Sequence, residues 1–422
     1  MNILFLSAHL PSPHARQAGQ KISYYLCQFL AQRHSVQLLA LCPDSEPENC
    51  GADCAQTFAS RTVIPVTAAS RLLGIVRSPF LPLCVSVRKH TRFRRVLASA
   101  MRNKAFDVII FDHMAMWQYA GHVPSTAIRT GIAHDVLSQL WARKADSNGG
   151  LAARLETRRL RNWERAAIGD LDLICALSAK DSQLIAELGD GLPRCVLQPW
   201  FSRAPDSDLP AAPGAEPALI FTGAFDRCEN IDAVKFTVAE ILPQVTRAVP
   251  QSTFYLAGAS GETLPRQVAR HPAVRVAGFV PDLLPFLLRM QIALLPLRLG
   301  AGIKTKVLEC MAAGLPVITT PVGAEGIPGQ DGVHFLIGRT AEELAGHAIL
   351  LLRNQPLRHR IGESARQFIR INYDFERSAR EFERMLMQRV SQRQLETMRM
   401  NAPATKSESG IGASRARQIP RG

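Results

Sequence analysis

Residues 292–327 of the chain are IALLPLRLGAGIKTKVLECMAAGLPVITTPVGAEGI. This pattern predicts a strand over 292–295, a glycine loop, a helix that begins near Ile303, and a second strand over 316–319 that leads into another glycine loop. Gly314 predicts the end of the helix, because glycine tolerates the left-handed backbone of a helix C-cap. Strand, loop and helix in this order form the repeating unit of a parallel sheet covered by helices.

The loop between the first strand and the helix has the composition of an anion site. Gly300 and Gly302 lack Cβ atoms, so the backbone can come close to a ligand, and the first turn of the helix directs unpaired N–H groups toward the loop. Arg298, Lys304 and Lys306 add positive charge around it. Such a loop suits a diphosphate whose negative charge grows as a bond to it breaks. An ordinary strand-helix unit whose glycines only form turns is the structural alternative.

Glu309 lies farther along the same predicted helix. A carboxylate can accept hydrogen bonds from two adjacent hydroxyls, such as those of a ribose. The helical spacing from Lys306 also allows an ion pair of roughly a few tenths of a kcal/mol. The residue pattern by itself leaves both interpretations open.

The rest of the chain repeats the alternation in two series. Short apolar stretches separated by helix-length segments run from Asn2 to Gln198, and a second series begins at Ala218, with a helix after Asn230, which we expect to be its N-cap. A chain of 422 residues is expected to have two hydrophobic cores. The predicted fold is therefore α/β, with two Rossmann-like doubly wound domains that face each other across a cleft.

Changes in composition set the predicted boundaries. We expect an N-terminal domain over 1–200, a proline-rich linker over 201–217 and a second domain over 218–372. A helix over 373–400 would pack back on the N-terminal domain. Residues 401–422, which are rich in Ser, Gly, Ala, Arg and Pro, are predicted to be disordered.

The pattern GxGIKxKxLExMAxGxPVxTxxxGxEGI over 300–327 resembles the donor-site signature of family-four retaining glycosyltransferases of the GT-B fold. Two other segments are similar to parts of that family: FTGAFDRCENIDAV at 221–234 and VRVAGFVPDLLPFL at 274–287. The resemblance extends from Asn2 to about Arg389. It implies that one domain binds a nucleotide-sugar and that the N-terminal domain offers the acceptor.

The resemblance also implies roles for single residues. In the second domain, Glu309 would bind the ribose hydroxyls, Arg298 and Lys304 would lie near the diphosphate, and the backbone of Val280 would face the nucleobase. In the N-terminal domain, Gly19 would approach the donor phosphates.

His134 matches a family histidine at the sugar end of the donor and is the candidate catalytic residue. The plainer alternative is a histidine bonded to backbone at the end of a strand. With an ordinary pKa of about 6.5 it could donate a hydrogen bond without carrying charge. One departure from the family is Ala301, which stands where a sugar-facing glutamate is often found.

The implied activity is transfer of a sugar from a nucleotide-diphosphate-sugar to a glycan or lipid-linked acceptor with retention of anomeric configuration, in the biosynthesis of cell-surface or extracellular polysaccharide. The leaving phosphate would deprotonate the acceptor hydroxyl, so no enzymic nucleophile is needed. No cofactor is expected, because the nucleotide-sugar is itself the donor substrate. We predict no metal either, because the DxD pairs Asp170/Asp172 and Asp206/Asp208 lie away from the phosphate loop. The alternatives are a GT-B sugar-nucleotide epimerase or a GT-B phosphorylase. No lysine in the sequence stands out as the attachment site of a pyridoxal cofactor.

The net charge of +14 and the pI near 9.8 indicate an anionic partner. Between Cys54 and Phe106 the sequence has no Asp or Glu, and the basic stretch 61–104 mixes arginines with apolar residues, among them Phe93 and Leu97. This pattern favours contact with an anionic membrane surface. A basic nucleic-acid-binding protein is the alternative of another class, but no reading module is recognisable and only 6% of the residues are aromatic, so we expect no nucleic acid.

The expected location is the cytoplasm, with peripheral attachment to the inner face of the cell membrane. No apolar stretch has the length of a membrane-spanning helix, and the first residues lack the features of a signal peptide. The nine scattered cysteines are expected to be reduced thiols, because their spacing fits neither a zinc site nor a disulfide framework.

Overall fold

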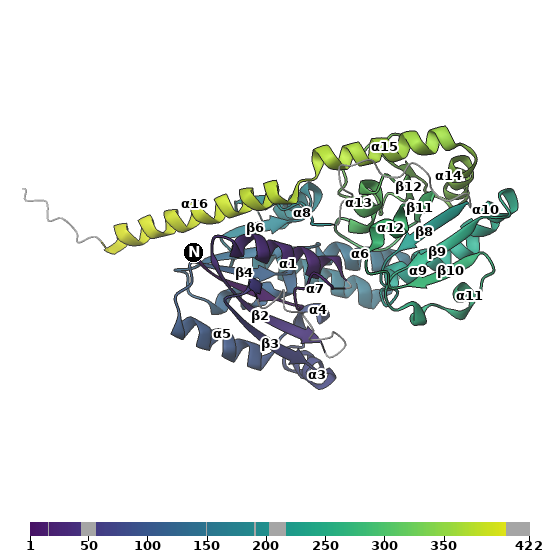
Figure 1. Ribbon diagram of the computed structural model, residues 1–422. Helices are drawn as coiled ribbons and strands as arrows, with labels where there is room; N and C mark the ends of the chain where they lie inside the picture. The colour runs from purple at the N-terminus through teal and green to yellow at the C-terminus, as the bar shows by residue number, and fades with distance from the viewer. Residues whose placement is uncertain (16, 44–55, 149, 190, 202–216, 402–422) are drawn as a thin grey trace, which may run out of the picture.

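The computed structural model describes residues 1–15, 17–43, 56–148, 150–189, 191–201 and 217–401. Apart from residues 201, 217 and 401, the predicted linker and tail lie outside the described residues. Figure 1 shows two lobes, each built on a twisted sheet with helices around it. The α/β prediction of two Rossmann-like domains with the GT-B architecture is confirmed.

The N-terminal sheet has seven parallel strands in the order β3-β2-β1-β4-β5-β6-β7. Side chains of β1 alternate between two cores, since Ile3 and Phe5 pack on one face of the sheet and Leu4 and Leu6 on the other. Both faces are therefore covered, as in a doubly wound sheet. The strands are β1 (Asn2–Ser7), β2 (Ser35–Pro43), β3 (Ser60–Val66), β4 (Val108–Asp112), β5 (Ile128–Ala133), β6 (Leu173–Ala176) and β7 (Arg194–Val196).

The helices of this domain connect successive strands. They are α1 (Ala18–Ala31), α3 (Ala68–Arg77), α4 (Leu83–Ser86), α5 (Thr91–Asn103), the 3-10 helix η1 (Met114–His122), α6 (Leu137–Asn148), α7 (Leu151–Ile168) and α8 (Ala179–Leu188). The strand order changes direction at β1, between β2 and β4. Ligands of doubly wound sheets bind beyond the carboxyl ends of strands at such a point.

The second sheet has six parallel strands in the order β10-β9-β8-β11-β12-β13. Its strands are β8 (Ala218–Thr222), β9 (Thr253–Ala257), β10 (Val274–Gly278), β11 (Ile292–Leu295), β12 (Val317–Thr319) and β13 (Leu336–Ile337). The sequence pattern did not predict β13, because two residues are too few to show a period.

The helices of the second domain lie between its strands and after the last of them. They are α9 (Cys228–Phe236), the π-helix η2 (Thr237–Ile241), α10 (Leu242–Ala248), the 3-10 helix η3 (Gly261–Thr263), α11 (Arg266–Ala269), α12 (Leu283–Leu287), α13 (Thr305–Ala312), α14 (Ala341–Arg353), α15 (Gln355–Asn372) and α16 (Phe375–Asn401). The N-cap prediction for Asn230 is wrong. The helix begins at Cys228 after an extended Arg227, so Asn230 lies within the first turn.

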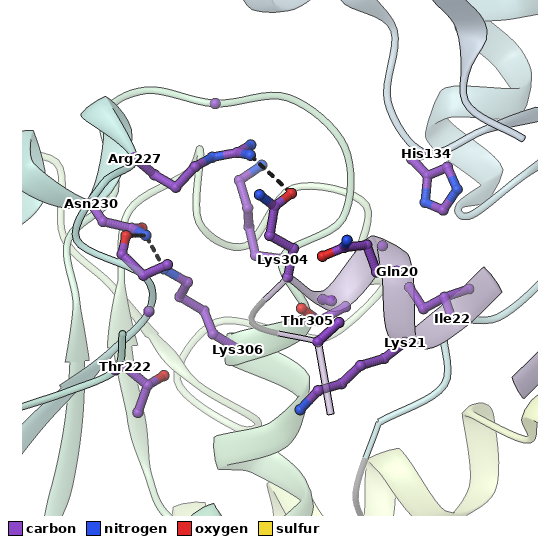
Figure 2. Close-up of a pocket in the computed structure, with 18 of the residues that line it drawn as sticks. Gln20, Lys21, Ile22, His134, Thr222, Arg227, Asn230, Lys304, Thr305 and Lys306 are labelled. Carbon is purple, nitrogen blue, oxygen red and sulfur yellow. Dashed lines mark hydrogen bonds between the residues drawn. The ribbon is translucent and has the colours of Figure 1, made fainter. Parts of the chain in front are cut away.

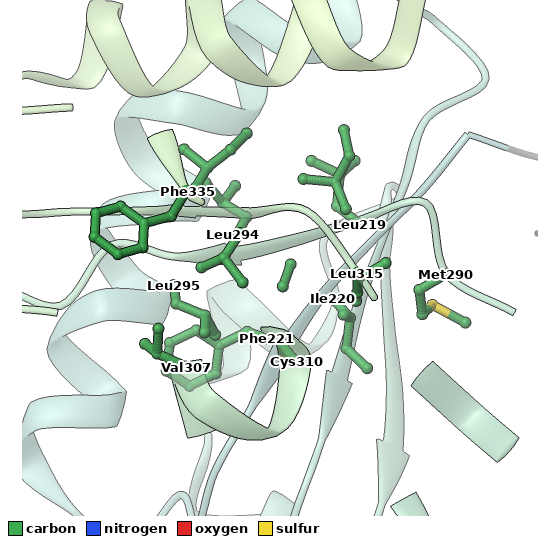
Figure 3. Packing of buried hydrophobic residues seen from close by; sticks show 14 of the residues in the cluster. Leu219, Ile220, Phe221, Met290, Leu294, Leu295, Val307, Cys310, Leu315 and Phe335 are labelled. Carbon is green, nitrogen blue, oxygen red and sulfur yellow. The ribbon is translucent and has the colours of Figure 1, made fainter. Parts of the chain in front are cut away.

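Helix α13 is held by its apolar face. Figure 3 shows Val307 and Cys310 packed near Phe221 of β8 and Leu295 of β11. Each fully buried aliphatic side chain contributes about 1.5–3 kcal/mol to folding, so the helix has a fixed position. It begins at Thr305, two residues later than the sequence pattern predicts.

Helix α16 crosses from the second domain to the first (Figure 1). Ala379, Phe382 and Leu386 are buried in the core of the N-terminal domain. At the edge of this contact, Glu383 accepts hydrogen bonds from Arg33, the shorter at 2.8 Å, and lies 2.8 Å from His34 Nε2. The helix therefore joins the two domains independently of the cleft.

The domains also touch beside the glycine loop. Gly302 has φ +66°, and a Cβ atom there would lie 2.7 Å from the backbone oxygen of His134 and 3.0 Å from Cβ of Asp135. Nearby, the Glu325 carboxylate forms salt bridges with two residues of the N-terminal domain, Arg143 at 2.6 Å and Lys180 at 3.0 Å. Gly302 thus allows close approach of the two domains.

Gly302→Ala should push the domains apart at this point, because the added Cβ atom meets backbone that cannot move away. Small-angle X-ray scattering should report a larger radius of gyration. Gly332→Ala is the matched control, since Gly332 also has positive φ, +77°, but no atom lies within 4 Å of its added Cβ. Both variants place an alanine in the left-handed backbone conformation, which lowers the free energy of unfolding by roughly 1–2 kcal/mol in each. An unchanged radius in Gly302→Ala would contradict this role.

Candidate functional site

A cavity of about 800 Å³ lies between the two domains. Residues that follow β4 and β5 line it from the N-terminal domain, and residues that follow β8, β9 and β11 line it from the second. In Figure 2, Arg227, Asn230 and Lys306 stand on one wall and His134 on the other. The carboxyl ends of both sheets thus point into one space.

The structure brings most of the sequence-predicted site residues to this cavity. Its lining includes six of the eight: Gly19, His134, Val280, Gly300, Lys304 and Glu309. Gly302 does not line it but lies beside it, against the backbone of His134 and Asp135. Gly19, in the first turn of α1, lies against the histidine ring, because a Cβ atom there would be 3.2 Å from His134 Nδ1. Val280 belongs to the loop after β10.

Two partly buried lysines mark the anion-binding part of the cavity. Lys304 Nζ donates to the backbone oxygens of Ala301 at 3.1 Å and Gly302 at 2.5 Å, and Lys306 Nζ donates to Asn230 Oδ1 at 2.5 Å. Burial lowers the pKa of each lysine to about 8. Among the described residues, no carboxylate forms an ion pair with either ammonium group, so an anionic ligand would supply the missing negative charge.

Arg298 does not reach the cavity, and its predicted place at the phosphate loop is not what the structure shows. Its two sequence neighbours in the loop after β11 do reach the cavity. Leu297 and Leu299 line the cavity. Arg298 instead forms a bidentate pair with Asp232 at 2.8 and 3.0 Å and lies over the ring of Phe236.

Arg227 is a cavity cation that the sequence interpretation missed. Its guanidinium pairs with Glu229 at 3.0 Å and donates to Gln17 Oε1 of the N-terminal domain at 3.3 Å. Burial opposes its charge, but Glu229 more than compensates, and the pKa of Arg227 is raised. The signal that could have found it is its position in the turn after the first strand of the second domain.

Glu309 projects from α13 into the base of the cavity. Burial raises the pKa of its carboxyl group, against the attraction of Lys21 and Lys306. The alternative of an ion pair with Lys306 is not what the structure shows, because Lys306 Nζ bonds Asn230. In the described part of the chain, the carboxylate has neither a hydrogen bond nor an ion pair, so both oxygens can accept from a ligand.

His134 forms a short charge-assisted pair with Asp112, another residue missed by the sequence interpretation. Its Nε2 lies 2.6 Å from Asp112 Oδ1, while Asp112 Oδ2 accepts from Ser7 Oγ at 2.7 Å and Ser23 Oγ at 2.9 Å. Burial opposes protonation of His134, but Asp112 outweighs it, and the pKa of His134 is raised. The other ring nitrogen, Nδ1, is buried without a partner in the described structure and faces Gly19.

The DxD aspartates that the structure describes, Asp170 and Asp172, do not line the cavity. Asp172 pairs with Arg129 at 3.1 Å and Arg393 at 2.9 Å. Asp206 and Asp208 lie outside the described residues.

Comparison with known proteins gives the class of the second domain. Residues 216–354 match the family model described as Glycosyl transferases group 1. One relative, an uncharacterized glycosyltransferase MJ1069 of Methanocaldococcus jannaschii, is 30% identical over 95 residues, which are 22% of this chain and 24% of that protein. The chain thus aligns with about a quarter of this relative. The second domain is therefore similar to group 1 glycosyl transferases.

Solved structures extend the similarity in fold to nearly the whole chain. Sucrose-phosphate synthase from Thermosynechococcus elongatus has a TM-score of 0.70 and 15% identity, with 93% of this chain and 100% of that chain covered. Anabaena Alr3699/HepE in complex with UDP-glucose has a TM-score of 0.64 and 14% identity, with 92% and 100% covered. TarM from S. aureus has a TM-score of 0.66 and 11% identity, with 92% and 100% covered.

Asp112→Asn should lower the pKa of His134, because the attraction that outweighs burial is removed while burial remains. Since the wild-type pKa is raised above 6.5, the stability from this pair is fully present below pH 6.5 and is lost as pH rises through the raised value. Titration of the histidine NMR signals should show protonation at higher pH in the wild type than in the variant. Asp170→Asn is the control, and equal His134 titration in all three proteins would refute the assignment.

Proposed function

We propose that the chain is a retaining glycosyltransferase that moves a sugar from a nucleotide-diphosphate-sugar to a glycan or lipid-linked acceptor. The observation that carries the proposal is the pair of partly buried lysines, Lys304 and Lys306, which face an interdomain cavity without ion-paired carboxylates in the described structure. A diphosphate would neutralise both. The similarity to group 1 glycosyltransferases supports a sugar nucleotide as its source.

The donor would lie along the second domain, from the start of α13 to the loop that contains Val280. The diphosphate would lie between the start of α13 and the side chains of Lys304, Lys306 and Arg227, and Glu309 would accept hydrogen bonds from the ribose hydroxyls. The backbone near Val280 would face the nucleobase. We propose uridine as that base, because the HepE structure, which is similar in fold, was solved in complex with UDP-glucose.

The chemistry follows from where charge develops. As the bond between the anomeric carbon and the phosphate oxygen breaks, negative charge grows on the leaving diphosphate, where the two lysines stabilise it. The acceptor hydroxyl attacks from the same face and transfers its proton to the leaving phosphate oxygen, so the anomeric configuration is retained. His134 would lie at the sugar end of the donor, where Asp112 holds its Nε2.

We further propose that transfer requires no metal and no cofactor. The positive charge that a bridging metal supplies in other transferases would come from lysine and arginine side chains here. Transfer measured in EDTA should proceed at the same rate as in added Mg²⁺ or Mn²⁺.

Lys306→Met and Glu309→Ala should each weaken UDP binding about tenfold or more, because each removes a charged partner of the ligand. Isothermal titration would measure this, and the same variants should lose turnover with a UDP-sugar. Binding should also weaken above about pH 8 as the two lysines lose their protons. Controls are the exposed Lys235→Met and Glu363→Ala. Wild-type UDP affinity in both cavity variants would exclude the proposed donor site.

We propose peripheral attachment to an anionic membrane at the cytoplasmic face, with a role in the synthesis of cell-surface polysaccharide. No described helix has the length and apolar character needed to cross a membrane. Of the residues expected to contact lipid, Phe93 and Leu97 do not, because both are buried in the core. Helix α5 therefore presents arginines but no apolar face to solvent.

The exposed apolar residues lie instead on α3, the segment before α4 and the start of α7. This apolar patch consists of Leu72, Leu73, Val76, Phe80, Leu83, Leu151 and Leu155. Its parts are joined, because Arg159 of α7 donates to the backbone oxygens of Pro79 and Leu81. Phe80 is 93% exposed. Exposed arginines border the patch: Arg71, Arg77, Arg154 and Arg158.

Leu72→Ser combined with Phe80→Ser should reduce co-sedimentation with phosphatidylglycerol vesicles about tenfold or more, because two apolar side chains no longer enter the bilayer. Binding of the wild type should weaken as salt is raised. The control Ile371→Ser changes a residue that is 67% exposed on α15. Equal vesicle binding by the double variant and the wild type would disprove docking through this patch.

A further inference from the structure

The N-terminal wall of the cavity contains a group of hydrogen-bond donors that the donor arrangement above does not use. His9, Arg88 and His113 all line this wall. We infer that these three residues form a second anion site, which binds a phosphate group of the acceptor. This inference rests on the proposed transferase function, whose acceptor it defines.

Arg88 is the centre of the group. Its Nη1 donates to the backbone oxygen of Cys84 at 2.9 Å, and its Nη2 lies 3.2 Å from His9 Nε2. No carboxylate among the described residues forms an ion pair with it, whereas the other cavity arginine, Arg227, has Glu229. Burial lowers the pKa of Arg88, but a guanidinium keeps its charge in proteins. A partly buried cation that forms no ion pair is a place where an anionic ligand can bind favourably.

His113 presents a donor to the cavity, and His9 orients Arg88. Arginine can only donate, so His9 Nε2 accepts from the Arg88 guanidinium. In His113, Nδ1 accepts from the backbone N–H of Ala115 at 3.2 Å, which leaves the proton on Nε2. Burial, followed by the charge of Arg88, lowers the pKa of His113 well below its ordinary value, so this ring is a neutral donor.

The backbone of His113 supports a functional reason for its position. Its φ is +78°, one of only two positive values among the described non-glycine residues. Such a conformation is strained for a side chain with a Cβ atom. Here it directs the imidazole from the end of β4 toward the cavity, between the rings of His9 and His134.

This anion site is separate from the donor diphosphate. Lys304 and Lys306 belong to the second domain, and Arg88 to the first. From His134, two successive ring contacts of 6.3 Å each lead through His113 to His9. A phosphate held at Arg88 would place the attached sugar between Arg88 and His134, with a hydroxyl toward the donor.

The same phosphate chemistry fits a soluble sugar phosphate and a lipid-linked one. Helix α4 joins the anion site to the apolar patch, because Leu83 at its start is 44% exposed while Cys84, the next residue, lines the cavity. A lipid tail attached to the bound phosphate could therefore continue over the patch.

The test uses the full chain with UDP at saturating concentration, so that the donor site is filled. Binding of glucose 1-phosphate and of micellar farnesyl phosphate is measured by isothermal titration for the wild type, Arg88→Gln and the exposed control Arg370→Gln. We expect Arg88→Gln to weaken phosphate binding about tenfold or more and to leave UDP affinity unchanged, and Arg370→Gln to alter neither. If circular dichroism shows that Arg88→Gln folds poorly, Arg88→Lys replaces it. Lysine keeps the positive charge but loses the forked guanidinium, so an intermediate loss of phosphate affinity is expected.

The outcomes separate the two proposals. Binding of glucose 1-phosphate identifies a soluble acceptor, and binding of farnesyl phosphate alone identifies a lipid-linked one; either supports the inference if Arg88→Gln weakens it. Phosphate binding that is equal in Arg88→Gln and the wild type, or absent from the wild type once UDP is bound, overturns the anion site. Absence of UDP binding to the wild type contradicts the proposed function instead.

Discussion

Two partly buried ammonium groups without ion-paired carboxylates in the described structure determine how the cavity works. Lys304 and Lys306 are held at the start of α13, whose apolar face fixes the helix in the core of the second domain. Their depressed pKa values show that burial disfavours their charge. A ligand that brings negative charge between them relieves this cost, and it does so most strongly when that charge is largest, as in the breaking of a phosphate bond.

The rest of the architecture places a second wall opposite these lysines. Gly302 lets the N-terminal domain approach the glycine loop, Glu325 pairs with Arg143 and Lys180 across the boundary, and α16 joins the domains on another side. The boundary beside the cavity is thus polar and charged rather than a continuous apolar core. Interfaces of this kind permit relative domain motion, which substrates need in order to enter an enclosed cavity.

The fold and the loop at 300–309 were predictable because each depends on local pattern: strand period, glycines, and a helix with one apolar face. Other site residues were not, for physical reasons. Arg298 is close in sequence to the loop, but its guanidinium pairs with Asp232 instead. Arg227 lies in the turn after β8 and Asp112 at the end of β4, and only the two parallel sheets bring these distant residues to the cavity. The basic helix α5 has its apolar residues buried, which charge counts alone do not reveal.

The most direct measurement of the central claim is hydrogen–deuterium exchange of the full chain with and without UDP. Occupation of the interdomain cavity predicts slower amide exchange in residues 300–309 of the second domain and, at the same time, in residues 17–23 of the N-terminal domain. Unchanged exchange at 300–309, or protection confined to regions away from the cavity, would contradict the account.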